Sequence, residues 1–141
     1  MTTGWPMKTR VLVVEDNPLV AKFYRMALER VAGYEVNCLE DVEVILRQVA
    51  AAAYDVAIID VSLRDCRYNG RVIDGLELTR LIRGLSAGEK MPILLATAHA
   101  MEGDRQRLLS ASGADAYLEK PIYDPHLLIG KIQELMKPKA Q

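Results

Sequence analysis

The sequence predicts an α/β domain in which a five-stranded parallel sheet is covered by helices on both faces. Short, continuous apolar runs recur along the 141 residues and lack the alternation of a half-exposed strand, as expected for parallel strands that are buried on both sides. Longer segments with apolar residues at helical spacing separate these runs. Right-handed crossovers place such helices on both faces of the sheet, which makes it doubly wound.

The first strand is expected at residues 10–14 (RVLVV), and a helix follows it closely. Asn17 can cap the N-terminus of that helix, and Pro18 suits its first position, where the missing backbone N–H costs nothing. Apolar residues then recur at helical spacing as far as Val31. Gly33 is expected to end the helix.

The same alternation predicts the rest of the domain. Further strands are expected at residues 35–39, 56–59, 93–96 and 116–118. Further helices are expected around residues 41–49, 78–85, 103–112 and 128–135. The helix around residues 103–112 has few apolar positions, which is compatible with a marginally stable, movable element.

Length and composition fit one domain. We expect an N-terminal extension at residues 1–8, the domain at residues 9–137 and a tail at residues 138–141.

Lys and Arg number 18 and Asp and Glu 19, so the net charge of −1 gives no overall electrostatic reason to bind nucleic acid or an anionic membrane. No apolar run approaches the ~20 residues of a membrane helix. Cys38 and Cys66 form no metal or redox motif, which favours free thiols in a reducing cytoplasm.

Polar side chains stand where the predicted strands end. Glu15 and Asp16 follow the first strand, Asp60 the third, Thr97 the fourth and Lys120 the fifth. In doubly wound sheets the functional crevice lies outside the carboxyl ends of the strands. We therefore expect these five side chains to gather at one edge of the sheet.

Three carboxylates that lie close together repel one another, so either their pKa values rise or a cation binds between them. Ligands that are all oxygen favour a hard ion such as Mg²⁺. Lys120 can neutralise a further charge, and the Thr97 hydroxyl can donate a hydrogen bond to a bound anion. A carboxylate can also attack phosphorus as a nucleophile. The set of residues therefore suits phosphoryl transfer, which mainly requires positioning and charge neutralisation.

Five strings in order carry a family resemblance: VLVVEDN, AIIDVSL, IDGLELTRLIR, PILLATAHA and GADAYLEKPI. From about Thr9 to Met136 the chain resembles the receiver domain of two-component response regulators. The resemblance implies a flavodoxin-like (βα)5 fold, with a doubly wound parallel five-stranded sheet in the strand order 2-1-3-4-5. It also implies a signalling switch that depends on phosphorylation.

The resemblance implies specific roles at the strand ends. Asp60 resembles the phosphoacceptor of the family. Glu15 and Asp16 resemble its acidic Mg²⁺ pair, with Asp60 and the backbone carbonyl of Ser62 as the remaining protein ligands.

Four further residues match the family's switch. Thr97 resembles the hydroxyl that moves toward the phosphoryl group, and Lys120 resembles its ion-pairing partner. Tyr117 resembles the aromatic residue that swings inward, although an aromatic at a sheet edge is often only packing. Thr97 could likewise be an ordinary helix-cap hydroxyl. Pro121 matches the family's cis-peptide proline.

The resemblance also implies partners. The phosphoryl donor is expected to be a phosphohistidine on a sensor histidine kinase or a phosphotransfer protein. Phosphorylation is expected to change a face around the fourth helix, fifth strand and last helix, which then binds a downstream protein. We expect no nucleic-acid or membrane binding through this chain and no output domain in it. We expect no enzyme activity beyond self-phosphorylation and slow autodephosphorylation. The expected location is cytoplasmic.

The chain departs from the family between Asp60 and the Asp74-Gly75 pair. The connecting run, VSLRDCRYNGRVI, is about seven residues longer than usual, and Leu63 and Arg64 stand where Met-Pro is common. The added residues include Arg67 and Arg71. Lengthening a surface loop costs little stability, so the run could be a solvated insertion or a recognition element.

Two other functions are possible. A phosphatase of the haloacid dehalogenase type also uses a nucleophilic Asp with Mg²⁺, but it needs a second Asp two residues later, where this chain has Ser62. A docking module that never takes phosphate would not need the three acids together with Thr97 and Lys120. A nucleotide-binding function is not supported, because the sequence has no Gly-rich phosphate loop.

Overall fold

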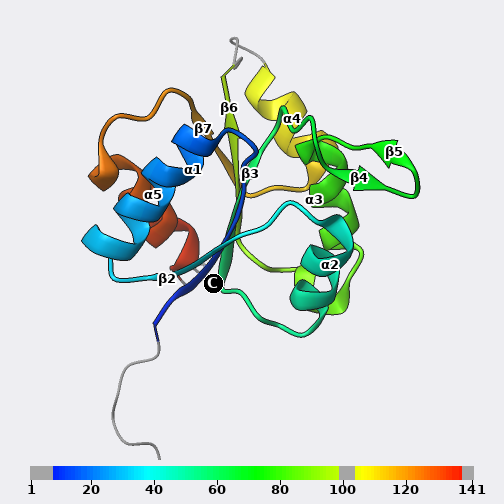
Figure 1. Cartoon of the computed structure of the whole chain (residues 1–141), viewed down its shortest axis with the longest axis horizontal. Helices are drawn as coiled ribbons and strands as arrows, with labels where there is room; N and C mark the ends of the chain where they lie inside the picture. Colours follow the sequence, from blue (N-terminus) through cyan, green and yellow to red (C-terminus); the bar gives the residue numbers. More distant parts are fainter. Residues whose placement is uncertain (1–7, 99–103, 138–141) are drawn as a thin grey trace, which may run out of the picture.

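Five parallel strands form the centre of the protein, which is shown as a computed structural model in Figure 1. The structure describes residues 8–98 and 104–137. The strands of the sheet are β1 Arg10–Val14, β2 Glu35–Cys38, β3 Val56–Asp60, β6 Ile93–Thr97 and β7 Ala116–Glu119. Their order is β2-β1-β3-β6-β7, and all four pairings are parallel. Counted along the chain without the short strands β4 and β5, this is the expected order 2-1-3-4-5.

Helices cover both faces of the sheet (Figure 1). The helical segments are α1 Pro18–Arg25, η1 Met26–Val31, α2 Val42–Ala50, α3 Gly75–Arg83, η2 Ser86–Gly88, α4 Asp104–Ser112 and α5 Pro125–Met136. α1, η1 and α5 pack with one buried cluster, whereas α2, α3 and α4 pack with the other. The expected doubly wound α/β architecture is therefore confirmed.

The first helix begins as expected but changes its winding. The Asn17 side chain accepts hydrogen bonds from the backbone N–H groups of Leu19 and Val20, and Gly33 lies just beyond the helix with φ of +74°. After Arg25 the helix continues as the π-helix η1, which apolar spacing alone cannot distinguish from an α-helix.

The long run after Asp60 contains an antiparallel hairpin, with strands β4 Arg67–Tyr68 and β5 Arg71–Val72. Asn69 and Gly70 form its turn with φ of 52° and 81°, the left-handed conformation that suits a two-residue hairpin. The pattern of the sequence does not predict these two short strands. The hairpin is tied to the domain, because its flanking residues Leu63, Cys66 and Ile73 are buried in the core on the α2–α3 face.

Some expectations concern residues outside the described ranges: the extension over residues 1–7, the tail at residues 138–141, and a helix start near Gly103. Within residues 8–98 and 104–137, no helix is long and apolar enough to cross a bilayer.

Candidate functional site

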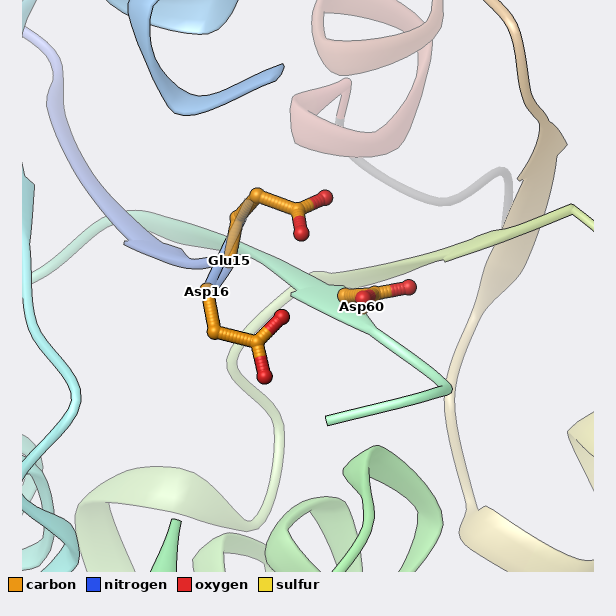
Figure 2. Close-up of side chains that lie close together, drawn as sticks. All are labelled: Glu15, Asp16 and Asp60. Atoms are coloured by element: carbon orange, nitrogen blue, oxygen red, sulfur yellow. The ribbon is translucent and has the colours of Figure 1, made fainter. Parts of the chain in front are cut away.

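The fold brings the acids at the strand ends together. Figure 2 shows the carboxylates of Glu15, Asp16 and Asp60 facing a common space. One oxygen from each lies within 4.8 Å of the others. Glu15 and Asp60 are each only 4% exposed, and Asp16 is half-buried. The pairing of β1 with β3 brings these acids together, because Val14 aligns with Ile59 and the acids follow these two residues at the same edge of the sheet.

Lys120 supplies the positive charge of the site. Its ammonium nitrogen lies 3.0 Å from Oε1 of Glu15 and 3.2 Å from Oδ1 of Asp60. Burial alone lowers the pKa of Lys120, but the hydrogen bond to Glu15 and the charges of both acids outweigh it, so the pKa is raised. Burial raises the pKa of Glu15 despite the hydrogen bonds from Lys120 and Asn17. One ammonium therefore does not fully compensate the cost of burying these carboxylates.

Backbone N–H groups hold the three carboxylates in place. Asn17 donates to Oε2 of Glu15 at 3.1 Å, and Ser62 donates to Oδ1 of Asp60 at 3.3 Å. Arg64 donates its backbone N–H to Oδ2 of Asp16 at 2.7 Å. The long run after Asp60 is thus attached directly to the acidic site through Arg64.

A cavity of about 430 Å³ opens onto this site. It is lined by Glu15, Asp16, Asn17, Asp60, Ser62, Arg64, Asp65, Ala98 and Lys120. The ligand atoms that converge here are carboxylate oxygens, without thiols or imidazoles from the described residues. This donor set fits Mg²⁺, which prefers oxygen ligands and is usually bound by one or two carboxylates plus phosphate oxygens.

The other predicted residues lie around the acids. Thr97 ends β6, is 2% exposed and accepts a hydrogen bond at its carbonyl from the Lys120 N–H at 2.7 Å. Tyr117 lies on β7, half-buried, and packs against the core on the α2–α3 face. The peptide bond between Lys120 and Pro121 is cis. All the predicted residues therefore lie at or near the carboxyl edge of the sheet.

Gly75 has a role at the site that the sequence alone does not reveal. Its N–H donates to the carbonyl of Val61 at 3.0 Å, and Asp74 caps the same helix by accepting from the N–H of Glu77. A Cβ at Gly75 would lie 2.0 Å from the carbonyl oxygen of Asp60. The start of α3 therefore rests directly on the backbone of Asp60, and only glycine permits this contact.

Comparison with known proteins agrees with this geometry. A family model described as the response regulator receiver domain matches residues 11–133. The PhoP transcriptional regulatory protein of Escherichia coli is 35% identical over 128 residues, covering 91% of this chain and 52% of PhoP. Hybrid signal transduction histidine kinase I of Dictyostelium discoideum is 33% identical over 126 residues, 84% of this chain and 7% of the kinase. The chain thus spans about half of PhoP and a small part of the kinase.

Two solved structures share the fold over nearly their whole length. The receiver domain of the sensor histidine kinase PA1611 from Pseudomonas aeruginosa, solved with a magnesium ion coordinated in its active site cleft, is 32% identical with a TM-score of 0.76. The match covers 92% of this chain and 98% of that domain. The chemotaxis protein CheY4 of Vibrio cholerae is 28% identical with a TM-score of 0.76, and the match covers 92% of this chain and 99% of CheY4.

Proposed function

Because this chain belongs to the response regulator receiver domain family, whose members are phosphorylation-dependent switches of two-component signalling, we propose that Asp60 is its phosphoacceptor. The observation that carries the proposal is the convergence of Asp60 with Glu15, Asp16 and Lys120 at one edge of the sheet. Asp60 lines the cavity, so a phosphoryl donor can approach its carboxylate.

The charges of the site explain the need for a divalent cation. Three carboxylates and one ammonium leave an excess of negative charge, which would repel an incoming phosphoryl group. Glu15, Asp16 and Asp60, with the backbone carbonyl of Ser62, would hold Mg²⁺. When bound, the ion supplies charge neutralisation for the phosphoryl oxygens.

The transfer is a displacement at phosphorus. A bond forms from an Asp60 carboxylate oxygen to phosphorus as the bond from phosphorus to the donor's imidazole nitrogen breaks, and the electron pair of that bond stays on the nitrogen. Lys120 turns its ammonium from the Asp60 carboxylate to an oxygen of the new phosphoryl group. The Thr97 hydroxyl then donates a hydrogen bond to another of these oxygens, and Tyr117 follows the movement of Thr97.

The donor is a phosphohistidine on a sensor histidine kinase or a phosphotransfer protein, and the output is a changed surface for a downstream protein.

The sparse burial of α4 supports a movable output face. Of the α4 side chains that the structure describes, Leu108 is the only buried apolar one, and elements with few buried contacts change conformation at low cost. Turnover of external phosphate esters is not supported, because Ser62 stands where an acid/base Asp would be needed.

Beryllofluoride binding tests the proposal, since this compound mimics an aspartyl phosphate. Calorimetric titration in the presence of Mg²⁺ should show saturable binding to the wild type and none to Asp60→Asn. The control is Asp55→Asn, which changes an acid paired with Arg10 away from the cavity and should bind like the wild type. A folded wild type that binds no beryllofluoride would overturn the proposal and favour a docking module.

A further inference from the structure

The β4–β5 hairpin projects beyond the helices that cover the sheet (Figure 1). Its base is nevertheless anchored, because Cys66 and Ile73 are buried and the Ile73 N–H donates to the Cys66 carbonyl at 2.9 Å. At the other end, Asn69 and Gly70 form its tight turn. Surface loops are usually mobile, whereas a hairpin that is fixed at both ends holds its exposed side chains in a defined arrangement.

Strand pairing gives the hairpin two different faces. Tyr68 lies directly opposite Arg71, and Arg67 lies opposite Val72. Successive side chains on a strand point to opposite faces, so Tyr68 and Arg71 share one face and Arg67 and Val72 share the other. Tyr68 packs against the core, whereas Arg67 and Val72 are exposed. The face with Tyr68 and Arg71 is therefore turned toward the domain.

A groove runs between this face of the hairpin and α3. Its cavity of about 430 Å³, termed the hairpin groove, is lined by Tyr68, Asn69, Arg71, Glu77, Arg80 and Leu81. Glu77, Arg80 and Leu81 share one face of α3, because residues three and four apart on a helix are neighbours. Each wall of the groove thus contributes one arginine.

The two arginines are positioned but not saturated. Nη2 of Arg71 lies 2.7 Å from Oε2 of Glu77, yet the Arg71 side chain remains 66% exposed. Nη1 of Arg80 donates to the carbonyl of Ala111 at 3.0 Å, and Arg80 is also exposed. A guanidinium carries several N–H donors, so each arginine keeps donors for a ligand. Among the six lining residues Glu77 is the only acid, which leaves the groove with a net positive charge.

We propose that the hairpin groove binds an acidic segment of a partner protein, with Arg71 and Arg80 paired to its carboxylates. Guanidinium groups match carboxylates through paired N–H···O hydrogen bonds. Tyr68 and Leu81 supply apolar surface for the stems of the acidic side chains. The lengthened run between Asp60 and Asp74 is then a recognition element, and this role does not depend on phosphorylation of Asp60.

A protein segment fits this groove better than a nucleic acid does. Binding to a phosphate backbone needs several cations in succession, whereas the groove offers two arginines with Glu77 between them, and the chain has a net charge of −1. Carboxylates spaced along a peptide can meet the two arginines without meeting Glu77.

The alternative is that Arg71 and Glu77 form an ordinary exposed ion pair that ties the hairpin to α3. Arg71→Gln and Glu77→Gln would then have the same small effect on stability and no effect on a ligand. In a binding groove, Glu77 instead competes with the ligand's carboxylates for Arg71. The two substitutions should therefore change ligand affinity in opposite directions.

The test is an NMR titration of the full chain with a short polyglutamate peptide at low salt. Backbone amide signals of residues 68–71 and 77–81 should shift on binding. Arg71→Gln and Arg80→Gln should each weaken binding about fivefold, the upper range for an exposed ion pair, and Glu77→Gln should strengthen it. The matched control is Arg67→Gln, which makes the same change of charge on the solvent face of the hairpin and should bind like the wild type.

Several outcomes would overturn the inference. Equal weakening by Arg67→Gln and Arg71→Gln would show that only overall charge matters, and the same shifts with polyglutamine would show that carboxylates are not recognised. Tighter, Arg71-dependent binding of a single-stranded oligonucleotide would assign the groove to nucleic acid. A dimer lost in Arg71→Gln would assign it to a second copy of the chain. Asp60→Asn should bind the peptide like the wild type, so this test and that of the proposed function fail separately.

Discussion

The ammonium nitrogen of Lys120 lies 3.0 Å from Oε1 of Glu15, at a position 105 residues later in the chain. The same nitrogen lies 3.2 Å from Asp60. This single cation joins the ends of three strands and is the main positive charge against three carboxylates. The site is therefore held in a compact arrangement but keeps an excess of negative charge.

Replacing Lys120 with methionine should make the protein depend on Mg²⁺ for stability. The change keeps the apolar stem but leaves two buried carboxylates without their shared donor, which should lower the free energy of unfolding by about 1–3 kcal/mol without metal. Mg²⁺ can replace the missing positive charge. In urea unfolding, Mg²⁺ should raise the free energy of unfolding more for Lys120→Met than for the wild type. An equal increase in the two proteins would show that Lys120 does not balance the charge of the carboxylates.

Gly75 and Gly130 offer a matched pair of substitutions. A Cβ at Gly75 would lie 2.0 Å from the Asp60 carbonyl oxygen, whereas a Cβ at Gly130 in α5 would meet nothing within 4 Å. Gly75→Ala should destabilise the protein by about 1–3 kcal/mol through overpacking and should weaken Mg²⁺ binding by displacing Asp60. Gly130→Ala should stabilise it by about 0.5–1 kcal/mol.

Thermal or urea unfolding combined with a Mg²⁺ titration checks this pair. If Gly75→Ala kept the stability and Mg²⁺ affinity of the wild type, α3 would not contact the backbone of Asp60 as closely as described.

Mg²⁺ affinity should depend on pH through Glu15. Burial raises the pKa of this carboxyl, so protons compete with the metal at a higher pH than for an exposed glutamate. Affinity should be full above the raised pKa and should fall as the pH decreases through it. Calorimetric titrations at several pH values should show this decrease beginning above the usual glutamate pKa of about 4.3.

The comparison variant for this prediction is Glu15→Gln. It should bind Mg²⁺ more weakly and should lose the part of the pH dependence that Glu15 contributes. A wild-type Mg²⁺ affinity that stays constant as the pH falls to the usual pKa of a glutamate side chain would contradict the prediction.

Ile73 should matter more for stability than its position in a lengthened loop suggests. It is 1% exposed in the core, whereas the neighbouring Val72 on β5 is 44% exposed. Ile73→Ala should lower the free energy of unfolding by about 2–5 kcal/mol through the cavity that it leaves. Val72→Ala should change it by less than about 0.5 kcal/mol. Equal effects would show that the hairpin is not anchored as described.

The fold and the strand-end residues could be predicted because buried parallel strands have a distinct pattern. Runs such as residues 10–14 and 56–59 are apolar without alternation, and the topology of a doubly wound sheet places whatever follows them at one edge. Glu15, Asp60 and Lys120 could therefore be grouped before any distance was known.

Other features depend on local or tertiary detail. Strands β4 and β5 have two residues each, too few for a periodic pattern, although Asn69-Gly70 is a strong turn signal. The contact between Gly75 and the backbone of Asp60 joins residues from two elements, and neither sequence segment encodes it alone.

Asp60 should accept a phosphoryl group in the presence of Mg²⁺. The most direct test is to incubate the protein with a small phosphoryl donor such as acetyl phosphate and to follow the intact mass. The wild type with Mg²⁺ should gain the mass of one phosphoryl group, mapped to the peptide that contains Asp60 and removed by hydroxylamine. Asp60→Asn, or the wild type with a chelator, should gain none. A phosphoryl group that appears equally on Asp60→Asn, or none on the folded wild type, would contradict the role of Asp60 as phosphoacceptor.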